Sequence, residues 1–182
     1  VVVVLPEDML TQTVAQRPLP KVFPTQTAIP DAGLLQIVKL LQKAQKPLVI
    51  AGGPSWSQDA ALALQKFAET WQLPVANAFR FQDTFDNHHP LYIGDVGIGI
   101  NPALAQTIAQ ADLLIVIGPR LGEMTTGGYS LIKAPLAQQT LVHIHQSPDE
   151  LNRVYQTPYA FSASMTQAAL QLSQLTVQQP HP

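Results

Sequence analysis

The sequence contains no cysteine among its 182 residues. Such a chain has no disulfide framework and no thiolate ligands for zinc or an iron–sulfur cluster. It also lacks a long apolar run: the opening residues 1–5 are far too few to cross a bilayer, and they carry neither the basic flank nor the cleavage site of a signal peptide. We therefore expect no membrane partner, and a cytoplasmic location is the default expectation.

Charged residues are scarce as well. They make up 12% of the chain, against about 25% in an ordinary soluble domain. The formal net charge of −2 offers no basic surface for nucleic acid or for an anionic membrane. A surface so poor in charge suggests that other domains or subunits cover part of it, although a lineage that favours glutamine is an alternative explanation.

What the chain does contain is a regular alternation of strand and helix patterns. Short apolar runs at 48–51, 74–78, 113–117 and 140–145 show no polar alternation, which is typical of strands buried on both faces of a parallel sheet. Helical spacing of apolar residues begins at Asp31, and capping patterns open further helices at Ser57, Asn101 and Ser164. The fold class predicted is α/β, a Rossmann-like doubly wound, mainly parallel sheet with helices on both faces.

The ends and two internal segments have a different composition. Residues 1–5 form a β-branched run that favours a strand, and residues 6–30 are rich in proline. We expect residues 1–30 to hold the end of a preceding domain plus a linker, residues 31–175 a central domain, and residues 176–182 the start of a second linker. Within the central domain, the glycine-containing stretch 88–99 is expected as a long loop, and residues 147–154 as a short helix with a capping box.

The carboxyl ends of parallel strands meet at one edge of a sheet, where open α/β folds bind their ligands. Gly52, Gly118 and His145 follow three of the expected strands, so they should converge. The Gly52-Gly53 turn can bring backbone N–H groups to a phosphate, although any tight β–α turn favours glycine. The sequence therefore predicts a crevice, without fixing its ligand.

An arginine and two histidines near this edge each allow more than one interpretation of their role. Arg120 offers a planar cation for a phosphate or a ring, or it forms a surface ion pair with Glu123. His143 and His145 share one face of a strand, but no third metal ligand accompanies them. We expect His143 in the core and His145 facing the crevice, and we assign no metal site.

Complete catalytic motifs are not found. The segment 97–102 begins like a dinucleotide-binding fingerprint but lacks its third glycine, and neither a nucleophile elbow nor a P-loop occurs. No catalytic residue is assigned.

Seven motifs nevertheless occur in a recognisable order. They lie at residues 46–53, 73–76, 89–94, 101–104, 111–122, 126–129 and 141–145. Their order resembles the central domain of thiamine-diphosphate-dependent enzymes, and it is most similar to the acetolactate synthase branch. The resemblance covers residues 31–175.

This resemblance implies a three-domain lyase or transferase acting on 2-oxo acids, assembled as a homodimer or homotetramer. In that family the catalytic glutamate and the motif for thiamine diphosphate and Mg²⁺ belong to the preceding and following domains. The resemblance therefore assigns no catalytic or metal-binding residue here, and the central domain alone is expected to be catalytically silent.

The central domain of this branch binds FAD, that of some relatives binds ADP, and others leave the crevice empty. The resemblance implies cofactor-binding positions at Gly52, Gly53, Asn77, Phe79, Asp95, Gly118, Arg120, His145 and Gln146. His145 stands where the family commonly has an aspartate, which argues against flavin. The alternatives are a purely structural or oligomerisation module with a vestigial crevice, and another nucleotide-binding fold such as a sirtuin or an electron-transfer flavoprotein. The lack of cysteine removes the usual zinc site of sirtuins.

Overall fold

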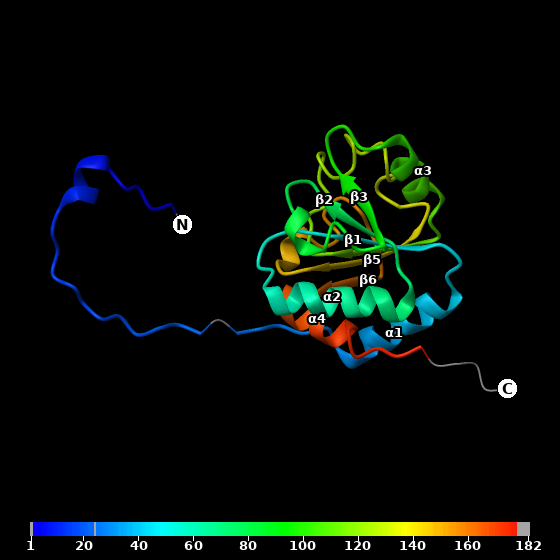
Figure 1. The fold of residues 1–182 in the computed structure, drawn as a ribbon, viewed down its shortest axis with the longest axis horizontal. Coiled ribbons are helices and arrows are strands. Elements are labelled where there is room, and N and C mark those ends of the chain that lie inside the picture. The colour runs from blue at the N-terminus through cyan, green and yellow to red at the C-terminus, as the bar shows by residue number, and fades with distance from the viewer. Residues whose placement is uncertain (1, 24, 178–182) are drawn as a thin grey trace.

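A computed structural model describes residues 2–23 and 25–177. Six strands form one sheet in the order β3-β2-β1-β4-β5-β6, and four α-helices pack on it (Figure 1). The elements are α1 (Asp31–Lys43), β1 (Pro47–Ala51), α2 (Gln58–Trp71), β2 (Val75–Ala78), β3 (Tyr92–Val96), α3 (Pro102–Gln110), β4 (Leu113–Ile117), β5 (Thr140–His145), β6 (Tyr159–Ser162) and α4 (Met165–Leu172), with the 3₁₀ turns η1 (Glu7–Thr11), η2 (Gln82–Thr84) and η3 (Pro148–Glu150).

All five strand pairs are parallel, which confirms the predicted doubly wound α/β fold. The chain leaves β1 toward β2 and β3 on one side, and it returns to β4 before continuing to β5 and β6 on the other. The strand order therefore reverses between β1 and β4. Such a reversal opens a crevice at the carboxyl edge of the sheet.

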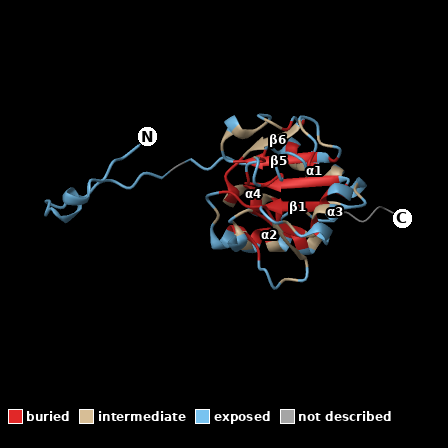
Figure 2. Ribbon diagram, turned by 90° about the horizontal axis from the view of Figure 1, so that it is seen from above, coloured by how far each residue is buried: buried red, intermediate tan, exposed pale blue. Residues whose placement is uncertain are grey.

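The sheet is covered on both faces, as predicted. Helices α1, α2 and α4 lie along one face, while α3 and the coil of residues 121–137 cover the other (Figure 1). Because β4 lies between these layers, all five of its residues are buried, and the neighbouring strands are largely buried as well (Figure 2). This explains why the apolar runs show no polar alternation.

Helix caps follow the sequence patterns closely. The side chains of Ser57, Asn101 and Ser164 accept backbone hydrogen bonds at the first turns of α2, α3 and α4. At α1 the sequence pattern favours Asp31 as the cap, and this is wrong by one residue, because Pro30 is the cap and Asp31 is already helical. A carboxylate in the first helical turn still stabilises the helix dipole.

Three local expectations differ from the structure. Residues 92–96 of the expected long loop form the strand β3, because pairing with β2 overrides the local glycine signal. Residues 147–154 form only the single turn η3, and the Ser147 side chain makes no capping bond. Residues 2–5 are exposed and form no strand, and Val1 lies outside the described residues.

The described residues of the proline-rich segment form no regular structure apart from the turn η1, and Figure 1 shows them running away from the body of the domain. Its described residues 2–23 and 25–28 are exposed, and it joins the body where the Thr27 carbonyl accepts a hydrogen bond from Ser164 N at 3.0 Å. In the part of the chain that the structure describes, no helix combines the length and hydropathy needed to cross a membrane.

Candidate functional site

The turns after β1 and β4 touch each other at the switch point. Gly52 N–H donates to the Ile117 carbonyl at 3.1 Å, and Gly118 N–H donates to the Ile144 carbonyl at 2.8 Å, so the ladder continues past the strand ends. Gly53 and Gly118 both have positive φ, and a Cβ on Gly53 would overlap the Gly118 carbonyl. The predicted convergence of these strand ends is confirmed. The close contact between the two turns is sufficient to explain why glycine occupies these positions, and a bound phosphate is not needed for that explanation.

A cavity of about 380 Å³ opens beside this switch point, between the loops that follow β2 and β4. Phe79, Phe81 and Tyr129 supply aromatic surface to it, and Arg120 supplies a guanidinium. The remaining lining residues are Pro119, Gly122, Glu123, Met124 and Thr125. Aromatic side chains suit a planar ring and a guanidinium suits an anion, so this lining can hold a planar ring beside an anionic group.

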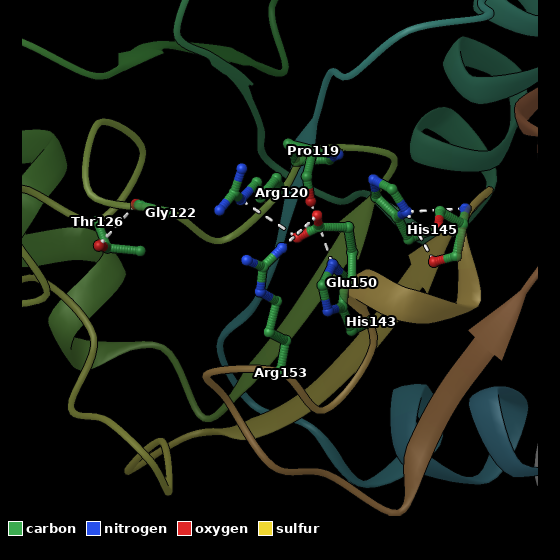
Figure 3. A network of polar contacts seen from close by, with 9 residues as sticks. Pro119, Arg120, Gly122, Thr126, His143, His145, Glu150 and Arg153 are labelled. Carbon is green, nitrogen blue, oxygen red and sulfur yellow. Dashed lines mark hydrogen bonds and ion pairs between the residues drawn. The ribbon is translucent and has the colours of Figure 1, made fainter. Parts of the chain in front are cut away.

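Arg120 does not pair with Glu123, the partner considered from the sequence. Its Nε lies 3.2 Å from Oε2 of Glu150, and Oε1 of Glu150 accepts a hydrogen bond from Nη1 of Arg153 at 2.9 Å (Figure 3). Because Glu150 belongs to η3, the loop after β5 orients a side chain that follows β4. The Arg120 side chain is 59% exposed, so it remains accessible to a ligand.

Behind this cluster lies His143, which is buried in the core as predicted. Its Nε2 lies 3.1 Å from the Pro119 carbonyl oxygen, which can only accept, so Nε2–H is the donor (Figure 3). Burial lowers the pKa of His143 to about 4, although the bond to Pro119 opposes this. The neutral imidazole therefore fixes the backbone immediately before Arg120.

His145 and Gln146 do not line the cavity. His145 is 8% exposed, and its Nδ1 lies 3.0 Å from the backbone N–H of Ser147, so the ring folds back on its own loop (Figure 3). Gln146 is exposed, and its carbonyl accepts a hydrogen bond from Ser162 Oγ at 3.3 Å.

Asn77 and Asp95 hold the loop after β2. The fully buried Asn77 amide donates to the Gln82 carbonyl at 3.0 Å and accepts from Thr84 Oγ1 at 2.9 Å. Asp95 accepts from Gln82 Nε2 at 3.0 Å, and burial raises the pKa of its carboxyl despite that bond. Both predicted cofactor contacts are thus engaged within the protein.

We expect Asn77→Ala to lower the free energy of unfolding by about 2 kcal/mol, because it removes a fully buried side chain together with its hydrogen bonds to the Gln82 carbonyl and the Thr84 hydroxyl. Urea denaturation measures the change. The matched control is Gln82→Ala, which keeps the backbone carbonyl and removes an exposed side chain with one hydrogen bond, to Asp95, and it should cost less than about 1 kcal/mol. Equal losses in the two variants would contradict the structural role of Asn77.

Of the nine predicted site residues, the cavity brings together only Phe79 and Arg120. Sequence reasoning placed Tyr129 in a motif but assigned neither Tyr129 nor Phe81 to the site, and it did not assign Glu150 and Arg153 to Arg120. The run of aromatic residues at 79–85 was the available signal for Phe81. No local signal links residues 120 and 150, because only the parallel pairing of β4 with β5 makes them neighbours.

Metal ligands are not gathered in this part of the chain. Among the residues that the structure describes, no three His, Asp or Glu side chains lie close enough together to hold a metal ion. The described residues therefore do not fit the Mg²⁺–diphosphate group of thiamine enzymes, and no catalytic step is derived through it.

The reversal of strand order between β1 and β4 makes this a doubly wound α/β domain, a fold that binds its ligands at the reversal. Residues 34–172 match the family model described as thiamine pyrophosphate enzyme, central domain. The chain belongs to this family, as the motif order predicted.

Several curated proteins are similar to the chain. It is 40% identical over 98 residues to a 3D-(3,5/4)-trihydroxycyclohexane-1,2-dione hydrolase of Geobacillus thermodenitrificans, covering 53% of this chain and 15% of that protein. It is 36% identical over 96 residues to a sulfoacetaldehyde acetyltransferase of Alcaligenes xylosoxydans xylosoxydans, covering 53% and 16%. Over 165 residues it is 26% identical to the acetolactate synthase isozyme 2 large subunit of Escherichia coli, covering 91% and 30%. The chain thus spans less than a third of the length of these relatives.

Proposed function

We propose that this central domain serves an acetolactate-synthase-like lyase or transferase acting on 2-oxo acids, and that its crevice binds an adenine nucleotide. One observation carries the nucleotide proposal: three aromatic side chains and Arg120 line one cavity at the switch point. The similarity to acetolactate synthase extends over 91% of the chain and supports the choice of branch.

The cavity residues have distinct roles in this proposal. Phe79, Phe81 and Tyr129 hold the planar base, and Arg120 binds the phosphate through its terminal nitrogens. A volume of about 380 Å³ lies near the small end of the range of about 300–1,000 Å³ for ligand pockets, which favours ADP over FAD. The inward-folded His145, standing where the family commonly has an aspartate, supports the same preference.

The proposal for the whole enzyme follows the family. Residues 1–30 and 176–182 would connect this domain to neighbours on either side, which hold thiamine diphosphate and Mg²⁺ in a homodimer or homotetramer. Thiamine diphosphate supplies the nucleophile for reactions of 2-oxo acids when it is bound. Carbon dioxide release from pyruvate by the whole protein, dependent on thiamine diphosphate and Mg²⁺, is the test. No release from pyruvate or other 2-oxo acids would reject this assignment.

We expect Arg120→Ala to weaken ADP binding by about tenfold, because a hydrogen bond to a charged group contributes about 1.5–3 kcal/mol. Calorimetric titration measures the affinity. Lys43→Ala is the control, since it removes the same charge from the end of α1, near the amino-terminal edge of the sheet. Unchanged ADP affinity in Arg120→Ala would remove the assigned role.

The rival is a structural or oligomerisation module whose crevice binds nothing. Two contacts favour it: the turns at Gly53 and Gly118 touch directly, and Nε of Arg120 already pairs with Glu150. A wild-type chain that is folded but shows no heat of binding with either ADP or FAD would support the module over the nucleotide site.

A further inference from the structure

Glu150 has an unusual position beside the cavity. Its carboxylate bridges two arginines, with one oxygen on Nε of Arg120 and the other on Nη1 of Arg153 (Figure 3). The Glu150 side chain is 19% exposed, whereas those of Arg120 and Arg153 are 59% and 53% exposed. The carboxylate is therefore the more fixed member of the cluster, and the arginines arrange around it.

The bridge leaves part of Arg120 free for a ligand. In the part of the chain that the structure describes, the Arg120 guanidinium pairs through Nε, so both terminal nitrogens can contact a phosphate. Glu150 nevertheless places a negative charge directly beside that position. Glu123, a second carboxylate, lines the same cavity.

The sum of these charges is small. Arg120 and Arg153 contribute two positive charges, and Glu150 and Glu123 contribute two negative ones. A further cation, Arg80, lies over the Phe79 ring, 4.9 Å from its centroid. A ligand phosphate thus gains the local contact to Arg120, while the two carboxylates offset the charges of Arg120 and Arg153. Repulsion from Glu150 grows with the charge of the ligand, since the Coulomb energy is proportional to that charge.

We propose that Glu150 is a specificity-determining residue of the crevice, which limits the negative charge of the nucleotide that Arg120 accepts. This inference rests on the adenine-nucleotide site proposed above. If Glu150 only orients Arg120, replacing Glu150 would change the affinities for AMP and ADP in the same direction and by the same factor. A charge-limiting Glu150 has an effect that increases from adenosine to AMP to ADP.

The experiment titrates adenosine, AMP and ADP into wild-type protein and Glu150→Gln at one ionic strength and pH 7.5. The glutamine keeps the shape and one acceptor oxygen for Arg120 while it removes the charge. We expect ADP to bind about fivefold more tightly, AMP less than fivefold more tightly, and adenosine with unchanged affinity. Arg153→Gln should weaken binding, most for ADP, less for AMP and not at all for adenosine. The reason is that the Glu150 carboxylate then has Arg120 as its one remaining arginine partner.

Glu69→Gln is the matched control. It removes the same charge from the exposed surface near the end of α2, close to the amino-terminal edge of the sheet, and should leave all three affinities unchanged. An equal change for AMP and ADP, or weaker ADP binding in Glu150→Gln, overturns the charge-limiting role while the nucleotide site stands. If none of the three ligands binds wild type or Glu150→Gln, the nucleotide site itself fails, and this inference fails with it.

Discussion

Replacing Gly118 by alanine is expected to lower the free energy of unfolding by about 4 kcal/mol. The φ angle of Gly118 is 90°, a backbone conformation that residues with a side chain rarely adopt. A Cβ at this position would also overlap the Gly52 carbonyl oxygen and approach Met165 Sδ. The backbone oxygen cannot move without disturbing the contact between the two turns. The loss is thus larger than that of an ordinary glycine substitution.

Gly99→Ala separates the two causes of this loss. Gly99 also has positive φ, at 73°, but no atom lies within 4 Å of a Cβ built there. Its substitution should cost only about 1 kcal/mol, from backbone conformation alone. Urea denaturation of both variants gives the two values. Similar values would mean that the turns after β1 and β4 separate easily.

Acidification is expected to destabilise the protein through His143, by about 2.5 kcal/mol between pH 7.5 and 4.5. Burial lowers the pKa of His143 to about 4 in the folded state, against an ordinary value of about 6.5 in the unfolded chain. In this pH window the unfolded chain binds a proton that the folded protein does not. The stability is therefore fully present above the unfolded pKa and is lost as the pH falls toward the folded pKa.

Other charges modify the size of this effect but not its direction. His145 lowers the pKa of His143, and the carboxylate of Glu150 raises it. His143→Gln keeps an N–H donor for the Pro119 carbonyl and removes the titrating group. Its unfolding free energy should fall less steeply than that of wild type, measured by urea denaturation at several pH values. Parallel pH profiles would show that His143 is not the responsible group.

Much of the fold could be predicted from the sequence because its signals are local. Caps at Ser57, Asn101 and Ser164, together with apolar runs, define helices and strands through their own neighbours in the chain. The strand β3 was missed because Gly94 interrupts it, and pairing with β2 decides its conformation. The capping box expected at Ser147 failed because the Glu150 side chain has arginine partners instead.

The candidate site was harder to predict than the fold. Parallel-sheet topology indicates which strand ends meet, and of the family positions Phe79 and Arg120 line the cavity. Neither the topology nor the family positions indicate where each side chain points. Asn77 turns into the loop that it holds, and His145 turns back to Ser147. Such orientations depend on hydrogen bonds that residue types alone do not specify.

The complete burial of β4 has a consequence for how its alignment with its neighbours is determined. Both faces of this strand carry only Leu, Ile and Val, so a slip of one residue would exchange apolar side chains for apolar side chains. Its ends differ. Asp112 accepts hydrogen bonds from the backbone of Gln45 and Lys46 at 2.6 and 2.9 Å, and Gly118 alone fits against the turn after β1. The carboxylate of Asp112 at one end and Gly118 at the other therefore set the register of the central strand. The five apolar residues between them stabilise the strand by burial but do not determine its register.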